Sequence, residues 1–238
     1  MIIIITMAGL GSRFRKAGYT LPKYEIEVRG KTIFEWSMLS LKGFAAKKYV
    51  FIVRKEDDSK SFIQKICNDM MISAEVLEID SLTLGQAETA MLAESFWKES
   101  EPILIYNIDT YVEPGEMNYS QIHGDGFIPC FNGKGDHWSF VKLDEQGKAL
   151  EIREKQRISN YCTVGAYYFR SAKLYTKLYK EYYLRSNKLE AGERYVAPLY
   201  NYLIERGGEV FISDIPADKV HVLGTPEEVE VFQSEATG

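Results

Sequence analysis

Short apolar segments alternate with amphipathic segments through the first half of the chain. The apolar segments predict buried strands at residues 2–6, 49–53, 75–79 and 103–108. Segments with helical spacing lie between them and predict helices at residues 32–45, 59–71 and 86–98. Strands that alternate with helices in this way are typical of βαβ units on a mostly parallel sheet. The first half therefore predicts an α/β fold.

After Gly124 the pattern changes to short strands joined by turns rich in Gly and Asp. Strands are predicted at residues 127–131, 139–143 and 163–169, and helices at 172–184 and 193–206. Gly207 and Gly208 end the last helix in the manner of a glycine C-cap. We expect a single domain over residues 1–238, with about residues 1–122 as one half and a smaller substrate lobe in about residues 123–238.

Two helix starts have the sequence of a capping box. Thr32 is followed by Glu35, and Thr225 is followed by Glu228. In each pair a hydroxyl and a carboxylate can satisfy unpaired backbone N–H groups of the first helical turn. We expect both to be structural features without a chemical role.

Composition narrows the classes of function. The chain has 29 Lys and Arg against 34 Asp and Glu, which argues against a broad surface for nucleic acids. The three cysteines at positions 67, 130 and 162 form no CxxC pair, so neither disulfides nor zinc are expected. The first apolar run is too short for a signal peptide, and no later run could span a membrane. We expect a cytoplasmic protein without a membrane or nucleic-acid partner, and a homo-oligomer remains open.

The segment at residues 7–23, MAGLGSRFRKAGYTLPK, directly follows the first predicted strand. Gly9 and Gly11 allow positive φ and leave room for backbone N–H groups to approach an anion. Arg13 and Lys23 add a planar guanidinium and a compact ammonium. The spacing is not that of a dinucleotide fingerprint, because Phe14 stands in place of its third glycine. The segment is either a phosphate-binding loop or a turn with solvated basic residues.

The order of these residues resembles the nucleotide-binding signature of the sugar-phosphate nucleotidyltransferases. That signature is AGxGxR, a spacer, PK, a short strand and a GK turn. The chain has it as Ala8, Gly9, Gly11, Arg13, Pro22, Lys23, a strand at 25–28, Gly30 and Lys31. The resemblance implies a Rossmann-like fold of the GT-A type, with Mg²⁺ as cofactor and an NTP and a sugar phosphate as substrates. It also implies that the first loop, with Ser12, binds the nucleotide.

A second loop contains Gly85, Gln86 and Ala87 at the start of a predicted helix. Tight packing and helix propensity alone would explain these small residues. The resemblance instead places Gly85 and Gln86 against the nucleobase, with Asp80 and Thr83 facing its edge. A carboxylate can accept a hydrogen bond from several bases, so Asp80 does not select one.

Asp109 follows a nearly all-apolar predicted strand. A carboxylate there is costly unless it faces a crevice and is paired, hydrogen-bonded or metal-bound. Mg²⁺ takes one or two carboxylates together with phosphate oxygens and waters, so Asp109 is the candidate metal ligand, with a helix or turn cap as the alternative. The family has Gly before this Asp, whereas Ile108 stands here.

The resemblance also covers the predicted acceptor side. Glu154 and Lys155 match an EK element, and Gly165 begins the matching strand. By this resemblance Lys155 holds the sugar phosphate, Glu154 a sugar hydroxyl and Gly165 the ring, with Glu190 as a further contact. The family's second metal-binding Asp precedes a GT pair, and Val222 occupies that position here.

The sequence therefore predicts transfer of a nucleotidyl group from an NTP to a sugar 1-phosphate, giving an NDP-sugar and pyrophosphate for capsule or other surface polysaccharide. Arg13, Lys23 and Asp109 are the expected catalytic residues. Three alternatives stay open: a cytidylyltransferase for phosphocholine or a similar acceptor, a glycosyltransferase, and a non-catalytic nucleotide-sugar-binding protein. The last is motivated by Val222.

Overall fold

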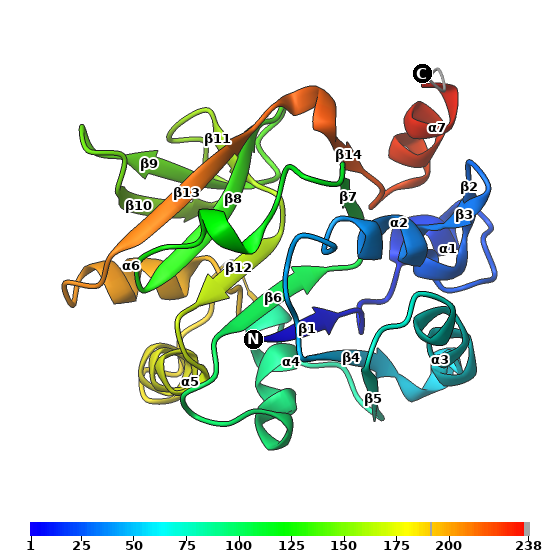
Figure 1. The fold of residues 1–238 in the computed structure, drawn as a ribbon, viewed down its shortest axis with the longest axis horizontal. Helices are drawn as coiled ribbons and strands as arrows, with labels where there is room; N and C mark the ends of the chain where they lie inside the picture. The colour runs from blue at the N-terminus through cyan, green and yellow to red at the C-terminus, as the bar shows by residue number, and fades with distance from the viewer. Residues whose placement is uncertain (191, 236–238) are drawn as a thin grey trace.

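The computed structural model describes residues 1–190 and 192–235, and its centre is a ten-stranded sheet (Figure 1). One side of the sheet is parallel throughout, in the order β5-β4-β1-β6. These strands are β1 (Ile2–Thr6), β4 (Lys48–Arg54), β5 (Ala74–Ile79) and β6 (Ile103–Asn107). Their bounds agree with the predicted strands to within one residue. The predicted Rossmann-like α/β fold is confirmed.

The strands of the second half extend this same sheet beyond β6. They continue it in the order β12-β8-β11-β9-β10, each antiparallel to its neighbours, and β13 pairs with β8 in parallel. Their bounds are β8 (Gly126–Asn132), β9 (Ser139–Leu143), β10 (Ala149–Glu154), β11 (Tyr161–Thr163), β12 (Ala166–Phe169) and β13 (Val210–Ile215). The predicted lobe therefore shares the central sheet, and its strands lie at the upper left of Figure 1.

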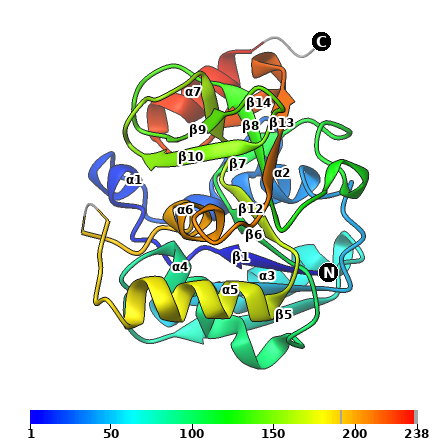
Figure 2. The ribbon, with the colours of Figure 1, turned by 90° about the vertical axis from the view of Figure 1, so that its left-hand side faces the viewer.

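Helices cover both faces of the sheet. The side chains of Ile2–Ile5 in β1 are apolar and buried on both faces, so each face needs a covering layer that excludes water. Ile3 and Ile5 pack in a core with side chains of α2 (Ile33–Leu39) and α3 (Lys60–Asp69). Ile2 and Ile4 pack in a second core with side chains from α4 (Gln86–Met91), α5 (Ala172–Tyr179) and α6 (Pro198–Ile204). In Figure 1, α2 lies above β1 and α4 and α5 lie below it, and Figure 2 shows α5 and α6 toward the viewer.

A third, smaller core joins the two ends of the chain. It contains Phe14, Ile33, Tyr111, Leu223 and Phe232. These residues come from or lie next to α1 (Ser12–Lys16), the hairpin β2 (Glu27–Val28) and β3 (Lys31–Thr32), the pair β7 (Thr110–Val112) and β14 (Val220–Val222), and α7 (Pro226–Ser234). The C-terminal helix is thereby held beside the N-terminal loop.

Short helical turns complete the structure. They are the 3₁₀ turns η1 (Lys23–Glu25), η2 (Lys55–Asp57), η3 (Leu92–Phe96), η4 (Tyr119–Gln121) and η6 (Ala217–Lys219), and a π-helical turn η5 (Lys180–Leu184). The turns η3 and η5 take up the ends of the helices predicted at 86–98 and 172–184. The predicted strand at 25–28 likewise begins as η1.

Three other predicted elements differ from the structure for local reasons. The helix predicted at 32–45 ends at Leu39 and is followed by turns. The helix predicted at 193–206 begins only at Pro198, since a proline suits the first position of a helix. The backbone N–H groups of residues 193 and 194 donate to carbonyls outside this helix. The strand predicted at 163–169 is divided into β11 and β12 by Gly165, whose φ is +81°.

The two predicted capping boxes have different outcomes. The first is confirmed: the Glu35 N–H donates to Thr32 Oγ1 at 3.2 Å, and the Thr32 N–H donates to Glu35 Oε2 at 2.8 Å. At the second, the Glu228 N–H donates to Thr225 Oγ1 at 3.1 Å. Within the described residues, however, the Glu228 carboxylate makes no return bond to Thr225, and its Oε2 is buried without a partner. The prediction of a complete second box was wrong.

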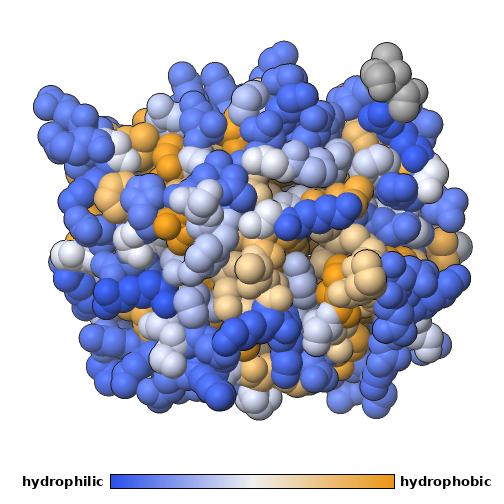
Figure 3. Space-filling view, viewed as in Figure 1, coloured by the Kyte–Doolittle hydropathy of each residue, from blue (hydrophilic) through white to orange (hydrophobic). Residues whose placement is uncertain are grey.

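The surface seen in Figure 3 is mostly hydrophilic, with apolar residues toward its centre. All three cysteines are buried free thiols. Within residues 1–190 and 192–235, every helix is too short or too polar to cross a membrane.

Gly43 gives a test of the packing after α2. A Cβ added there would lie 2.1 Å from the Met117 carbonyl oxygen, so Gly43→Ala must displace backbone. We expect it to lower the free energy of unfolding by about 1–3 kcal/mol, measured by urea denaturation. Lys42→Ala, at an exposed neighbouring position, should change it by less than about 0.5 kcal/mol. Equal values for the two variants would contradict the close contact.

Candidate active site

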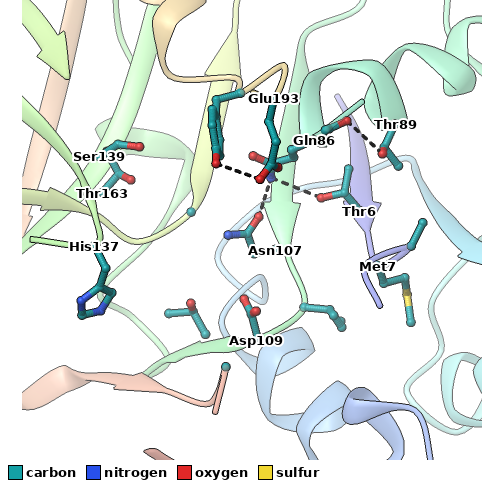
Figure 4. A pocket seen from close by; sticks show the side chains of 18 of the residues that line it. Thr6, Met7, Gln86, Thr89, Asn107, Asp109, His137, Ser139, Thr163 and Glu193 are labelled. Carbon is teal, nitrogen blue, oxygen red and sulfur yellow. Dashed lines mark hydrogen bonds between the residues drawn. The ribbon is translucent and has the colours of Figure 1, made fainter. Parts of the chain in front are cut away.

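A cavity of about 680 Å³ lies at the carboxyl ends of β1 and β6. The strand order reverses at this point, because β4 lies beside β1 on one side and the later strand β6 lies beside β1 on the other. Such a switch point is where open α/β sheets bind ligands, and the volume suits a nucleotide-sized molecule. Figure 4 shows Thr6 and Met7 at the end of β1 facing Asn107 and Asp109 at the end of β6.

The first loop supplies the positive charge of the cavity. Ala8, Gly9 and Arg13 line it, and so does Lys23. Arg13 is exposed and makes no ion pair within the described residues, so its guanidinium is available to an anion. Gly11 has φ +60° and starts α1, but it lies outside the cavity lining, as does Ser12.

Lys23 is held in place by the residue that follows it. Tyr24 is buried, and its hydroxyl donates to Ser59 Oγ at 3.0 Å. Burial raises the pKa of Tyr24, which keeps the phenol neutral and able to donate. The Lys23 Nζ in turn lies 2.5 Å from Asp109 Oδ2. The ammonium therefore sits between the two loops that the sequence assigned to phosphate and metal.

Asp109 is fixed through its backbone on both sides. The Ser37 hydroxyl donates to the Ile108 carbonyl at 2.9 Å, and the Leu223 N–H donates to the Asp109 carbonyl at 2.8 Å. Pairing of β14 with β7 sets Val222 opposite Thr110. The C-terminal segment is thereby brought to Asp109, and Val222 and Gly224 line the cavity with it.

The Gln86 side chain connects the end of β1 to the end of β6. Its Nε2 donates to Thr6 Oγ1 at 3.2 Å and also to Asn107 Oδ1, as the dashed lines in Figure 4 show. The Asn107 N–H donates to the Gly165 carbonyl at 3.1 Å. Asn107 thus ties the first half of the chain to the start of β12, a role that the sequence did not predict for it.

Gly85 is required by a close approach of the backbone. Its φ is +140°, and an added Cβ would lie 2.8 Å from the nitrogen and the oxygen of Arg194. The Arg194 N–H donates to the Leu84 carbonyl at 2.7 Å, and the Ala87 N–H donates to the Arg194 carbonyl at 2.9 Å. These bonds carry Glu193 and Tyr195 into the cavity from the second half of the chain.

The far wall of the cavity is acidic and aromatic. Glu154 accepts a hydrogen bond from Ser139, and burial raises the pKa of the Glu154 carboxyl. Trp138 and His137 lie on the same wall, and Figure 4 shows His137 across the cavity from Met7. Gly165 also lines it, so two of the four predicted acceptor residues face the cavity.

The other two predicted acceptor residues lie outside the lining, and so does Asp80, a third predicted nucleotide residue besides Gly11 and Ser12. Lys155 is at the rim, where its Nζ donates to the Tyr195 hydroxyl at 2.6 Å, and this bond raises the pKa of Lys155. Glu190 is paired with Lys188 at 2.9 Å. Asp80 is exposed and lies 3.4 Å from Lys55. The structure therefore does not bring Glu190 and Asp80 to the cavity.

The cavity residues to which the sequence interpretation gave no chemical role include Asn107, Glu193, Tyr195 and Glu228. Asn107 could have been noticed, because it is a polar residue at the end of an apolar strand two positions before Asp109. Glu193 lay in a predicted helix, which concealed it. Glu228 was explained as a cap.

The donor set fits Mg²⁺ bound together with phosphates. Within residues 1–190 and 192–235, no group of three or more His, Cys, Asp or Glu side chains could hold a metal ion by itself. A magnesium ion needs only one or two carboxylates when phosphate oxygens and waters complete its shell. Asp109 supplies one carboxylate, and the buried, unpartnered Oε2 of Glu228 is a second oxygen of the same cavity.

A Rossmann-like sheet with a basic loop and a carboxylate at its switch point defines a class of nucleotide-binding enzyme. The chain is 37% identical to the nucleoside-diphosphate-sugar pyrophosphorylase of Vibrio cholerae RC9, with a TM-score of 0.90 over 99% of this chain and 100% of that one. The chain therefore belongs to the sugar-phosphate nucleotidyltransferase family. Neither a family model nor a curated protein matches it.

Two more distant structures share the fold. The inositol-1-phosphate CTP transferase of T. maritima is 17% identical, with a TM-score of 0.76 over 100% of this chain and 98% of that one. The CTP:phosphocholine cytidylyltransferase of Streptococcus pneumoniae is 14% identical, with a TM-score of 0.75 over 98% of this chain and 97% of that one.

Gly165 allows a controlled test of the site's packing. A Cβ there would lie 2.4 Å from Asn107 Nδ2, whereas one at Gly147, with nearly the same φ of +80°, would meet nothing within 4 Å. Both variants to Ala should lose about 1–2 kcal/mol for the left-handed backbone. Gly165→Ala should lose about 1–3 kcal/mol more from the clash, measured by urea denaturation. Equal losses of unfolding free energy in the two variants would show that the Asn107 side chain moves aside at no cost in stability.

Proposed function

We propose that the protein transfers a nucleotidyl group from an NTP to a sugar 1-phosphate and releases pyrophosphate. One observation carries the proposal: Arg13, Lys23 and Asp109 line the same cavity as Glu154 and Gly165. A basic loop for a triphosphate and a polar wall for an acceptor thus share one space. About residues 1–122 hold the nucleotide and about residues 123–238 hold the acceptor.

The reaction needs charge neutralisation and alignment more than proton transfer. An oxygen of the sugar phosphate attacks the α-phosphorus in line, the new O–P bond forms, and the bond to the β-phosphate oxygen breaks. Because the nucleophile is already an anion, no strong general base is required. Arg13 and Lys23 stabilise the charge on the α-phosphate and the departing pyrophosphate, and Lys155 at the rim orients the nucleophile.

Lys23 forms an ion pair with Asp109, and this pair must break before the Lys23 ammonium can bind a phosphate. Its Nζ lies 2.5 Å from Asp109 Oδ2. Mg²⁺ bound with the NTP would add positive charge to the phosphates. Asp109 would hold such an ion, and Lys23 would stabilise the charge of the α-phosphate.

The remaining predicted residues divide between the two substrates. Gly85 and Gln86 face the base, and Ala8, Gly9, Gly11 and Ser12 shape the loop around the phosphates. Asp80 reaches the base edge only if its loop moves, since its side chain is exposed and lies 3.4 Å from Lys55. Glu154 binds a sugar hydroxyl and Gly165 supports the ring. Glu190 needs a comparable movement, and Glu193 is the better placed carboxylate.

A cationic acceptor such as phosphocholine is the second candidate. The acceptor wall favours it through two carboxylates, Glu154 and Glu193, and through the rings of Trp138 and Tyr195. Quaternary ammonium groups bind to the faces of such rings. For a sugar acceptor, we propose that the NDP-sugar supplies capsule or other surface polysaccharide, as the family resemblance implies.

The substrate assignment is tested by a grid of pyrophosphate-release assays. The five common NTPs are each combined with a panel of sugar 1-phosphates and with phosphocholine, with and without Mg²⁺. We expect release from one NTP with a sugar 1-phosphate, and only with Mg²⁺ present. Release with phosphocholine alone would select the second candidate. No release anywhere, together with tight binding of an NDP-sugar, would identify a non-catalytic binding protein.

Arg13→Ala tests the phosphate loop directly. Because the guanidinium acts on charge that develops in the transition state, we expect kcat to fall about 100-fold or more. Lys16→Ala removes one positive charge from the same helix at an exposed position outside the cavity, so its kcat should match that of the unmodified protein. Unchanged turnover in Arg13→Ala would remove Arg13 from the catalytic residues.

A further inference from the structure

Two T-x-x-E segments of this chain place their glutamates differently. Glu35 returns a hydrogen bond to the Thr32 backbone at 2.8 Å, and its box is complete. Glu228 has the same position in its helix and accepts nothing from Thr225 within the described residues. Its carboxylate belongs to the lining of the cavity instead. Glu228 therefore does not cap its own helix with its carboxylate and lies among the residues that line the cavity.

The two carboxylates of Asp109 and Glu228 face one small space beside Gly224. A Cβ added to Gly224 would lie 3.3 Å from Asp109 Oδ2 and 3.4 Å from Glu228 Oε2. Glycine leaves this space open, because any side chain would fill it. The two acids are 119 positions apart and meet because β14 pairs with β7.

The Oε2 of Glu228 is buried and has no hydrogen-bond partner within the described residues. A buried carboxylate oxygen is costly unless a donor or a cation compensates it. Asp109 already has Lys23 on the oxygen that faces Gly224. Positive charge in the space beside Gly224 would satisfy the Glu228 oxygen as well.

We propose that Glu228 is the second carboxylate ligand of the Mg²⁺ ion, together with Asp109. It takes the role that the apolar Val222 cannot fill at the end of β14. Two carboxylates suit Mg²⁺ when substrate phosphates and waters supply the other oxygens. The proposal deepens the proposed function, since it names the residues that bind the ion, and it is tested without any turnover.

The test measures Mn²⁺ binding to the purified protein by electron paramagnetic resonance, with Mn²⁺ alone and with inorganic pyrophosphate. We expect Glu228→Gln to weaken binding by about tenfold or more, and Asp109→Asn to do the same. Glutamine also serves in a capping box, so Glu228→Gln keeps any capping role. Glu227→Gln is the matched control, because it removes the same charge from an exposed position in the same turn. It should leave Mn²⁺ affinity unchanged.

Equal Mn²⁺ affinities for Glu228→Gln and Glu227→Gln would overturn the proposal. So would a loss in Asp109→Asn alone, which would leave a site with a single carboxylate. These results are independent of the pyrophosphate-release assays. A protein that binds Mn²⁺ through Glu228 and releases no pyrophosphate would fail as the proposed enzyme and still have this metal site.

Discussion

The position of β1 between two parallel neighbours determines where the site can form. β4 lies on one side of it and β6 on the other, so the loops after β1 and β6 leave the sheet at the same edge and diverge. Lys23 and Asp109, 86 positions apart, meet at this edge. The wall that we propose for the acceptor depends on the same arrangement, because β12 pairs with β6 and brings Gly165 beside Asn107.

The charged side chains that line the cavity are acidic on balance, with two basic residues against four carboxylates. Lys23 and Asp109 neutralise each other at 2.5 Å, while Arg13 stays free of ion pairs within the described residues. The acids Glu154, Glu193 and Glu228 line the remaining walls. A triphosphate alone would meet repulsion from these carboxylates, whereas its complex with a divalent cation meets far less. The site is therefore suited to a metal–nucleotide complex.

The sequence predicted the parallel strands well, because runs such as residues 2–6 are apolar on both faces and admit few other structures. It also singled out Arg13, Lys23 and Asp109, which lie in the segments that follow β1 and β6 and line one cavity. It could not predict Glu193, because Pro198 and the bonds to Leu84 and Ala87 replace the expected helix. Glu228 was missed for a related reason: its local pattern is that of a cap, and only the pairing of β14 with β7 turns it to the site.

The approach of Gly85 to Arg194 joins the two halves of the chain at the cavity. The backbone of Arg194 is bonded on one side to Leu84 and on the other to Ala87, so the loop that carries Gly85 and the segment with Glu193 and Tyr195 form one hydrogen-bonded unit. A ligand that orders this loop would also fix Glu193 and Tyr195, which line the same cavity. In the proposed enzyme, the substrate bound at this loop would therefore meet part of the entropic cost of organising the site of the other.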